Sequence, residues 1–260
     1  MKSTGATAPS CWACPILAHT DIKARLNARG QGLDDTDWHI HTLYDGLLPG
    51  ATTVRATFHR YVIDANRDPS GVSLYPGQNT TGLVPLTDFD GQDIWNTPPT
   101  KDEVEARRQA FHAPYHEALE AELERVRDLH GVAILYDCHS IRSHIPFLFD
   151  GTLPDFNIGT NLGTTCAPEI EAAVQNLCEM AEGYSSVTNG RFKGGWTTRH
   201  YGRPADGLHA IQMELAQSTY LKDEAAPWTY DTEKSARLRG YLKTILTTLA
   251  DLAPDLKGTS

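Results

Sequence analysis

Several segments of the chain concentrate residues that could carry out acid–base, metal or anion chemistry. One of them, DCHSIRS, directly follows the apolar run 132–136 and contains Asp137, His139 and Arg142. A histidine at the end of a buried strand is well placed to bind a metal ion or a substrate, and Asp137 could orient its ring. The alternative is a loop histidine held only by hydrogen bonds, and the residue types alone leave both interpretations open.

A second segment, RYVIDANRDP, ends another apolar run with closely spaced charged residues. The planar guanidinium of arginine binds carboxylates through two parallel hydrogen bonds, so Arg67 beside Asn66 indicates a site for an anion. An ion pair of Arg60 with Asp64, or of Arg67 with Asp68, is the structural alternative. Both roles are compatible if Asp64 braces an arginine.

Two further segments add a glycine-rich stretch and a carboxylate within an apolar strand. NGRFKGGWTTRHYG supplies Arg199 and His200 among glycines, which allow a ligand to approach the backbone closely. In HAIQMELAQ, the alternation of an extended strand puts Gln212 and Glu214 on the face opposite Met213. A carboxylate there is costly unless it is paired, for example with Arg199, or serves as a general base for metal-bound water.

Helices and strands alternate in the elements that must position these segments. A capping box at Thr100–Glu103 and the apolar spacing after it predict a helix that ends near Gly131, and the run 132–136 predicts a buried strand. The other expected elements are a short helix within 34–44, one or two strands within 51–65, helices at 167–182 and 233–251, and strands at 186–188 and 209–215. This order predicts an α/β protein with a mostly parallel central sheet, which binds ligands at the carboxyl ends of its strands.

Composition narrows the possible classes of protein. The chain has 260 residues, of which 40% are hydrophobic and 22% charged, and a net charge of −10. This balance indicates a globular protein and argues against general binding of nucleic acids or anionic membranes. Five scattered cysteines, without a secretory signal, indicate free thiols and a cytoplasmic protein. We expect one domain over 1–260, with 1–10 disordered.

Taken together, TDWHIHTLYD, RYVIDANRDPSGVSLYPGQ, DCHSIRS, NGRFKGGWTTRHYG and HAIQMELAQ resemble the N-formylglutamate amidohydrolases, in order from about Asp34 to Tyr220. The resemblance implies metal-dependent hydrolysis of N-formyl-L-glutamate to L-glutamate and formate, at the end of a histidine degradation route. It also implies a three-layer sandwich with a mixed central sheet, similar to the zinc carboxypeptidases.

The resemblance assigns roles to individual residues. It implies that His19, Asp37 and His139 hold a divalent metal ion, zinc being suited to two imidazoles and a carboxylate. It implies that Glu214 is the general base. The residues expected to bind the substrate, a small acidic N-acyl amino acid, are Asn66, Arg67, Arg142, Arg199 and His200. The family's N-terminal Pro-His-x-Gly is replaced here, so His19 aligns with its histidine only across a shortened segment.

Two other functions stay open from the sequence. The chain could be a related metal-dependent deacylase or peptidase acting on another N-acyl acidic amino acid. With its altered N-terminal motif, it could instead bind acidic amino acids without hydrolysing them. A serine hydrolase is disfavoured because Ser140 lies outside any G-x-S-x-G elbow.

Overall fold

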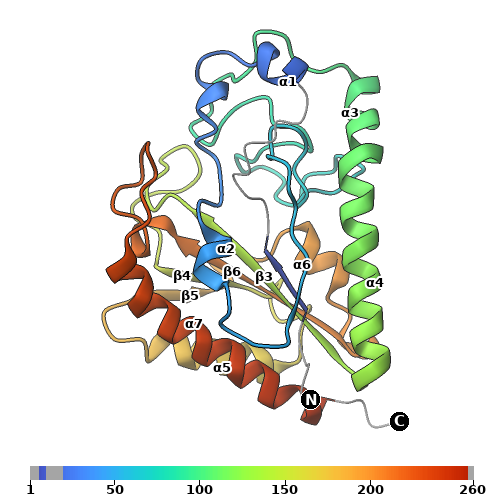
Figure 1. Cartoon of the computed structure of the whole chain (residues 1–260), viewed down its shortest axis with the longest axis vertical. Coiled ribbons are helices and arrows are strands. Elements are labelled where there is room, and N and C mark those ends of the chain that lie inside the picture. The colour runs from blue at the N-terminus through green and yellow to red at the C-terminus, as the bar shows by residue number, and fades with distance from the viewer. Residues whose placement is uncertain (1–5, 10–19, 257–260) are drawn as a thin grey trace.

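A six-stranded sheet forms the centre of the computed structural model, which describes residues 6–9 and 20–256 (Figure 1). The strand order is β2-β1-β3-β6-β4-β5. The strands are β1 (Ala6–Pro9), β2 (Thr52–Thr53), β3 (Ala133–Ile141), β4 (Phe156–Gly159), β5 (Ser186–Thr188) and β6 (Leu208–Ala216). All neighbours pair in parallel except β4 and β6, which are antiparallel. The prediction of an α/β protein with a mostly parallel, mixed sheet is confirmed.

Helices cover both faces of this sheet and complete three layers. The helices are α1 (Thr20–Arg25), α2 (Ile40–Tyr44), α3 (Lys101–Arg107), α4 (Ala113–His130), α5 (Pro168–Glu179), α6 (Trp196–Tyr201) and α7 (Thr232–Leu252). Figure 1 shows α5 and α7 crossing one face, whereas α4 runs along the other. Among the described residues, no helix is both long and apolar enough to cross a bilayer.

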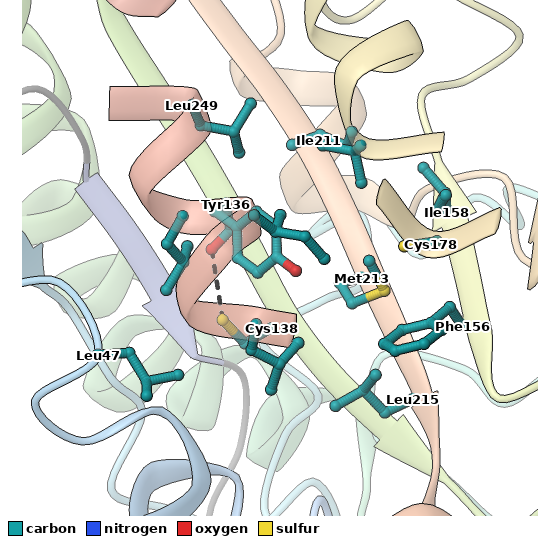
Figure 2. Close-up of a cluster of buried hydrophobic side chains, with 14 of the residues drawn as sticks. Leu47, Tyr136, Cys138, Phe156, Ile158, Cys178, Ile211, Met213, Leu215 and Leu249 are labelled. Atoms are coloured by element: carbon teal, nitrogen blue, oxygen red, sulfur yellow. Dashed lines mark hydrogen bonds between the residues drawn. The ribbon is translucent and has the colours of Figure 1, made fainter. Parts of the chain in front are cut away.

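The core under α5 and α7 fixes which way the two central strands face (Figure 2). In β3 and β6, Tyr136 lies opposite Ile211 and Cys138 opposite Met213, and all four side chains are buried in this core. Each such side chain stabilises the fold by about 1.5–3 kcal/mol relative to exposure. Because side chains alternate along a strand, the residues between them point to the opposite face. The polar side chains of β3 and β6 therefore point to the face of the sheet that is covered by α4 and α6.

A long helix on that side follows the predicted bounds closely. Thr100 accepts a hydrogen bond from the Glu103 backbone N–H and completes the capping box, and Gly131 ends the helix at φ 79°. Between α3 and α4, residues Arg108–His112 form one π-helical turn. Such a turn takes up one extra residue while the helix continues on both sides of it, and such turns are frequent near functional sites.

The strands expected within 51–65 are mostly absent, since only Thr52–Thr53 pair as a strand in the described structure. The stretch after them runs through turns, such as the bond from the Val62 N–H to the His59 carbonyl. Its apolar residues Tyr61, Val62 and Ile63 are nonetheless at most 1% exposed. Their β-rich composition reflects burial of an irregular segment rather than a hydrogen-bonded ladder.

Two other expectations need correction, and one strand was missed. The strand at 132–136 extends to Ile141, so His139 lies within β3 and not in a loop. Residues 6–9 form β1 between β2 and β3, so the expected disorder over 1–10 is wrong for this stretch. Its pairing is made by backbone groups and needs no apolar pattern in the sequence. β4 was not predicted, because its four residues carry too short a signal.

Candidate functional site

A pocket opens where the carboxyl ends of β3 and β6 meet the loops above the sheet. The residues of its wall that matter most for chemistry are Asn66, Arg67, His139, Arg191, Gln212 and Glu214. The polar face of the two strands forms the floor, and irregular segments around 66–81 and 191–195 form the sides. This is the position at which open α/β sheets bind their ligands.

Glu214 and His139 form the floor of this pocket. The register of β3 and β6 sets them directly opposite each other, and their exposed fractions are only 7% and 3%. Gln212, two residues earlier on β6, donates from Nε2 to Glu214 Oε2 at 3.2 Å. Burial raises the pKa of Glu214 to about 8, although the neighbouring imidazole of His139 opposes the rise. A carboxyl group with such a pKa can both accept and return a proton near neutral pH.

His139 is held by polar groups on both of its ring nitrogens. Nε2 lies 3.1 Å from Asp137 Oδ1 and 3.0 Å from Asn66 Nδ2, and Nδ1 lies 3.7 Å from Asp37 Oδ1. Burial disfavours charge on the ring, but Asp137 and Asp37 outweigh it and raise the pKa of His139 well above its usual value. Asp137 therefore contacts the ring as its position in DCHSIRS suggested.

Asp37 and His139 are two of the three residues expected to hold a metal ion, and they fit that role. The Asp37 carboxylate faces Nδ1, while Asp137 holds the other side of the ring, which is the usual way a metal-binding histidine is oriented. The third, His19, lies outside the described residues. Within 6–9 and 20–256, no group of three or more histidine, cysteine, aspartate or glutamate side chains could hold a metal ion. The described residues alone therefore do not provide a complete set of metal ligands.

Arg67 lines the side of the pocket and is fixed mainly by neutral acceptors. Nε donates to the Thr81 carbonyl at 3.0 Å, Nη2 to Thr81 Oγ1 at 3.1 Å, and Nη1 to the Asn66 carbonyl at 3.0 Å. Asp64 lies 3.7 Å from the guanidinium. The group therefore keeps a defined orientation, and its one carboxylate partner among the described residues, Asp64, lies beyond hydrogen-bond distance.

Arg60 lies between two carboxylates, whereas Arg67 has only Asp64, which it shares with Arg60. The Arg60 guanidinium lies 3.4 Å from Asp37 and 3.5 Å from Asp64. Burial alone would raise the pKa of Asp64, but Arg67 and Arg60 together lower it below its usual value. Asp64 thus braces both arginines, so the structural and the functional interpretations of this segment hold together.

The structure also fixes the main chain that carries Asn66 and Arg67. His116 Nε2 donates to the Ala65 carbonyl at 2.8 Å, and His112 Nε2 donates to the Arg67 carbonyl at 3.0 Å. Both histidines belong to the long helix, on either side of the end of its π-helical turn. Burial lowers the pKa of His116 to about 3, so its ring stays neutral.

Three residues expected to bind substrate do not line the pocket. Arg142 pairs with Asp90 at 3.1 Å. The other two leave the pocket because α6 begins at Trp196 and turns their side chains aside. Arg199 donates to the Gly194 carbonyl at 2.9 Å, and His200 is exposed and stacks on Trp196 with 4.3 Å between ring centroids. Glu214 makes its described side-chain hydrogen bond with Gln212, so the alternative pairing with Arg199 is not what this structure shows.

Sequence reasoning missed Arg191 and the aromatic residues Tyr75, Phe89 and Phe192, which also line the pocket. Arg191 belongs to the glycine-rich segment from which Arg199 and His200 were chosen instead. Its position before the glycines, rather than in the helix after them, is the signal that could have identified it.

A buried carboxyl group, an imidazole and an arginine oriented mainly by neutral acceptors, gathered at the carboxyl ends of parallel strands, define an α/β enzyme for a small anionic substrate. The family model for N-formylglutamate amidohydrolase matches residues 17–221. The chain therefore belongs to the N-formylglutamate amidohydrolase family, a class of enzymes that hydrolyse amide C–N bonds. This confirms the family resemblance found in the sequence.

Individual relatives agree with this assignment. N-formylglutamate deformylases from Pseudomonas aeruginosa and Pseudomonas putida are each 46% identical over 231 residues, 88% of this chain and 86% of theirs. Two solved structures share the fold. The N-formylglutamate amidohydrolase of Ralstonia eutropha JMP134 has a TM-score of 0.77 at 24% identity, over 97% of this chain and 95% of its own. A gene product of Agrobacterium tumefaciens has a TM-score of 0.70 at 18% identity, over 96% and 91%.

Proposed function

We propose that this protein hydrolyses N-formyl-L-glutamate to L-glutamate and formate. The observation that carries the proposal is the buried pair Glu214 and His139 in the same pocket as the oriented guanidinium of Arg67. An acidic amino acid bound through a carboxylate at Arg67 has its amide within the same small cavity. The names of the two Pseudomonas relatives support this substrate.

The proposed reaction uses the chain's own residues in a defined order. Arg67, together with the Asn66 amide, holds a substrate carboxylate and thereby fixes the formyl group over the pocket floor. Glu214 accepts a proton from the water that attacks the formyl carbon. It then gives this proton to the amide nitrogen as the C–N bond breaks, which releases formate and the free amine of glutamate. Gln212 holds the carboxyl group of Glu214 by a hydrogen bond, and His139 lies opposite Glu214 on β3.

We further propose that a divalent metal ion, zinc for this set of ligands, is held by Asp37 and His139, with His19 as the third ligand. The similarity to the zinc carboxypeptidases that the family resemblance implies is part of the same proposal. When bound, such an ion lowers the pKa of a water molecule and polarises a carbonyl group. The reaction would end a histidine degradation route. A cytoplasmic location is supported by the buried cysteines Cys138, Cys166 and Cys178, which form no disulfide with one another in the described part of the chain.

The direct test measures formate released from N-formyl-L-glutamate by protein as purified, after chelation, and after zinc is restored, with metal content determined in each sample. We expect activity that falls on chelation and returns with zinc. Release of formate without any bound metal would refute the metal proposal alone. Absence of formate release from fully zinc-loaded protein would refute the proposed function. A panel of N-acyl acidic amino acids then tests the related deacylase activity.

The role of Glu214 has its own test. In Glu214→Gln, shape and substrate binding should be kept, whereas kcat should fall by roughly 10²–10⁴, the usual contribution of acid–base catalysis. Circular dichroism, metal content and KM serve as controls. A folded variant with near-normal kcat would exclude Glu214 as the general base.

A further inference from the structure

The pocket contains a second arginine with the properties of an anion site. Arg191 is half-buried, and its Nε and Nη2 donate to the main-chain carbonyls of Leu148 and Asn79 at 2.8 and 2.9 Å. The side chain also lies over the rings of Tyr75 and Phe192, with 5.5 and 5.3 Å from Cζ to the centroids. These contacts fix the guanidinium against the wall without neutralising its charge.

The charge of Arg191 is uncompensated in this position. Within the described part of the chain, it forms no ion pair, unlike Arg60, which lies between Asp37 and Asp64. Burial lowers the pKa of Arg191, Tyr75 and Glu214 oppose this effect, and the nearby positive charge of Arg67 adds to it, so that the pKa stays below its usual value. A half-buried cation that is held by neutral groups and repelled by a second cation is stabilised when an anion enters between them.

The two arginines occupy different places relative to the reacting groups. Arg67 lies on the side of the pocket next to Asn66, whose amide lies 3.0 Å from His139 on the floor, so Arg67 adjoins the reacting groups. Arg191 is anchored instead to the loops that carry Asn79 and Leu148, on the pocket wall. In an N-formyl acidic amino acid, the α-carboxylate is attached to the carbon that bears the amide, whereas the other carboxylate lies beyond the side-chain methylene groups.

We infer that Arg191 binds the side-chain carboxylate of the substrate, while Arg67 binds the α-carboxylate. This assignment rests on the proposed function and adds the reason for its selectivity. The pocket selects a dicarboxylate over an N-formyl amino acid with a neutral side chain. A side chain that ends in an amide would leave the charge of Arg191 unpaired, and substrates of that kind should be poor ones.

The experiment compares N-formyl-L-glutamate with N-formyl-L-glutamine, which differs only in the charge of the side-chain end. We expect the wild-type protein to prefer the glutamate substrate in kcat/KM. In Arg191→Gln, kcat/KM for N-formyl-L-glutamate should fall roughly 10- to 100-fold, as for the loss of a hydrogen bond to a charged group. In the same variant, kcat/KM for N-formyl-L-glutamine should change less than about threefold relative to the wild type. The preference should therefore largely disappear.

Arg237→Gln is the matched control. Arg237 likewise donates to a main-chain carbonyl, that of Glu182, and lies over a tyrosine ring, that of Tyr184, but it belongs to α7 and not to the pocket. The Arg237→Gln variant should keep the wild-type preference for N-formyl-L-glutamate over N-formyl-L-glutamine. A ratio of the two kcat/KM values in Arg191→Gln equal to that of the wild type would overturn the inference.

A binding measurement separates this inference from the proposed function. By calorimetry, glutarate should bind the wild-type protein more tightly than butyrate, and Arg191→Gln should lose that difference. This readout needs no turnover, so it tests Arg191 even if N-formyl-L-glutamate is not hydrolysed. If Arg191→Gln fails to fold, the wild-type protein decides alone, because equal affinity for glutarate and butyrate would refute a second carboxylate site.

Discussion

Substitution of Gly195 by alanine should disturb the site through Asn66 alone. A methyl group on Gly195 would lie 2.5 Å from Asn66 Cγ, which is closer than any real contact of this kind. The backbone itself tolerates alanine, since φ is −80° and ψ is −168°. The Asn66 side chain must therefore move, and it loses its bond from the Thr197 N–H at 3.0 Å and its contact with His139 at 3.0 Å.

The magnitude follows from these losses. Two hydrogen bonds at about 1 kcal/mol each, less about 0.5 kcal/mol gained because alanine restricts the unfolded chain, give a loss of about 1.5 kcal/mol. For a chain of this length, that lowers Tm by about 3–6 °C. Because the displaced amide also lies beside His139 and Arg67, kcat/KM should fall at least about tenfold. Urea denaturation and formate release measure the two effects.

A double-mutant cycle tests the physical reason. Asn66→Ala removes the side chain that the methyl group would strike, so Gly195→Ala should cost almost nothing further in that background. Gly240→Ala is the control for the same chemical change. Its methyl group would meet nothing within 4 Å in the interior of α7, and it should stabilise the protein by up to about 1 kcal/mol. A full penalty from Gly195→Ala in the Asn66→Ala protein would refute the steric explanation.

Two further outcomes can be measured on the same protein. Arg67→Lys keeps the positive charge but loses the planar guanidinium group that Thr81 and Asn66 orient. The resulting fall in kcat/KM should correspond to a loss of about 1–3 kcal/mol in binding free energy, seen mainly as a higher KM. An unchanged KM would remove Arg67 from the substrate site. His116 should weaken the fold in acid, because its pKa of about 3 in the folded protein lies below the ordinary 6.5, so the unfolded chain takes up the proton first as the pH falls below 6.5. Between pH 7 and 5 this lowers the free energy of unfolding by about 2 kcal/mol. Urea titrations should find a smaller loss in His116→Gln, but not in His144→Gln, which changes an exposed histidine. Equal pH dependence in both variants would contradict this explanation.

The sequence predicted best where a regular backbone carries a periodic signal. The long helix and its capping box follow from helical spacing, and the shared face of Gln212 and Glu214 follows from alternation along a strand. The same rule places Asp137 and His139 together, once β3 is seen to continue to Ile141. These features depend on local geometry, which the sequence specifies directly.

Irregular segments were predicted poorly because their conformation depends on distant contacts. The stretch after Thr53 reads as strand, but it is buried as a series of turns whose carbonyls are held by helix side chains. In the glycine-rich segment, the start of α6 decides which basic residues reach the pocket, and it excludes Arg199 while Arg191 points inward. Neither outcome has a signal in residue type alone.

The π-helical turn at Arg108–His112 has a consequence for how this site can change in evolution. His116 and His112 of the long helix hydrogen-bond to the main-chain carbonyls of Ala65 and Arg67, which lie in no strand. The turn holds one residue more than an α-helical turn, so removing one residue from it would restore an ordinary α-helix with the two sides still in register. Adding a residue, or removing two, would rotate the two sides relative to each other by about 100°, and either the histidines or the capped start of the helix would then leave its place. Insertions and deletions should therefore be tolerated in the exposed loops, while the helix between Thr100 and His116 should vary only by the one residue that its wide turn takes up.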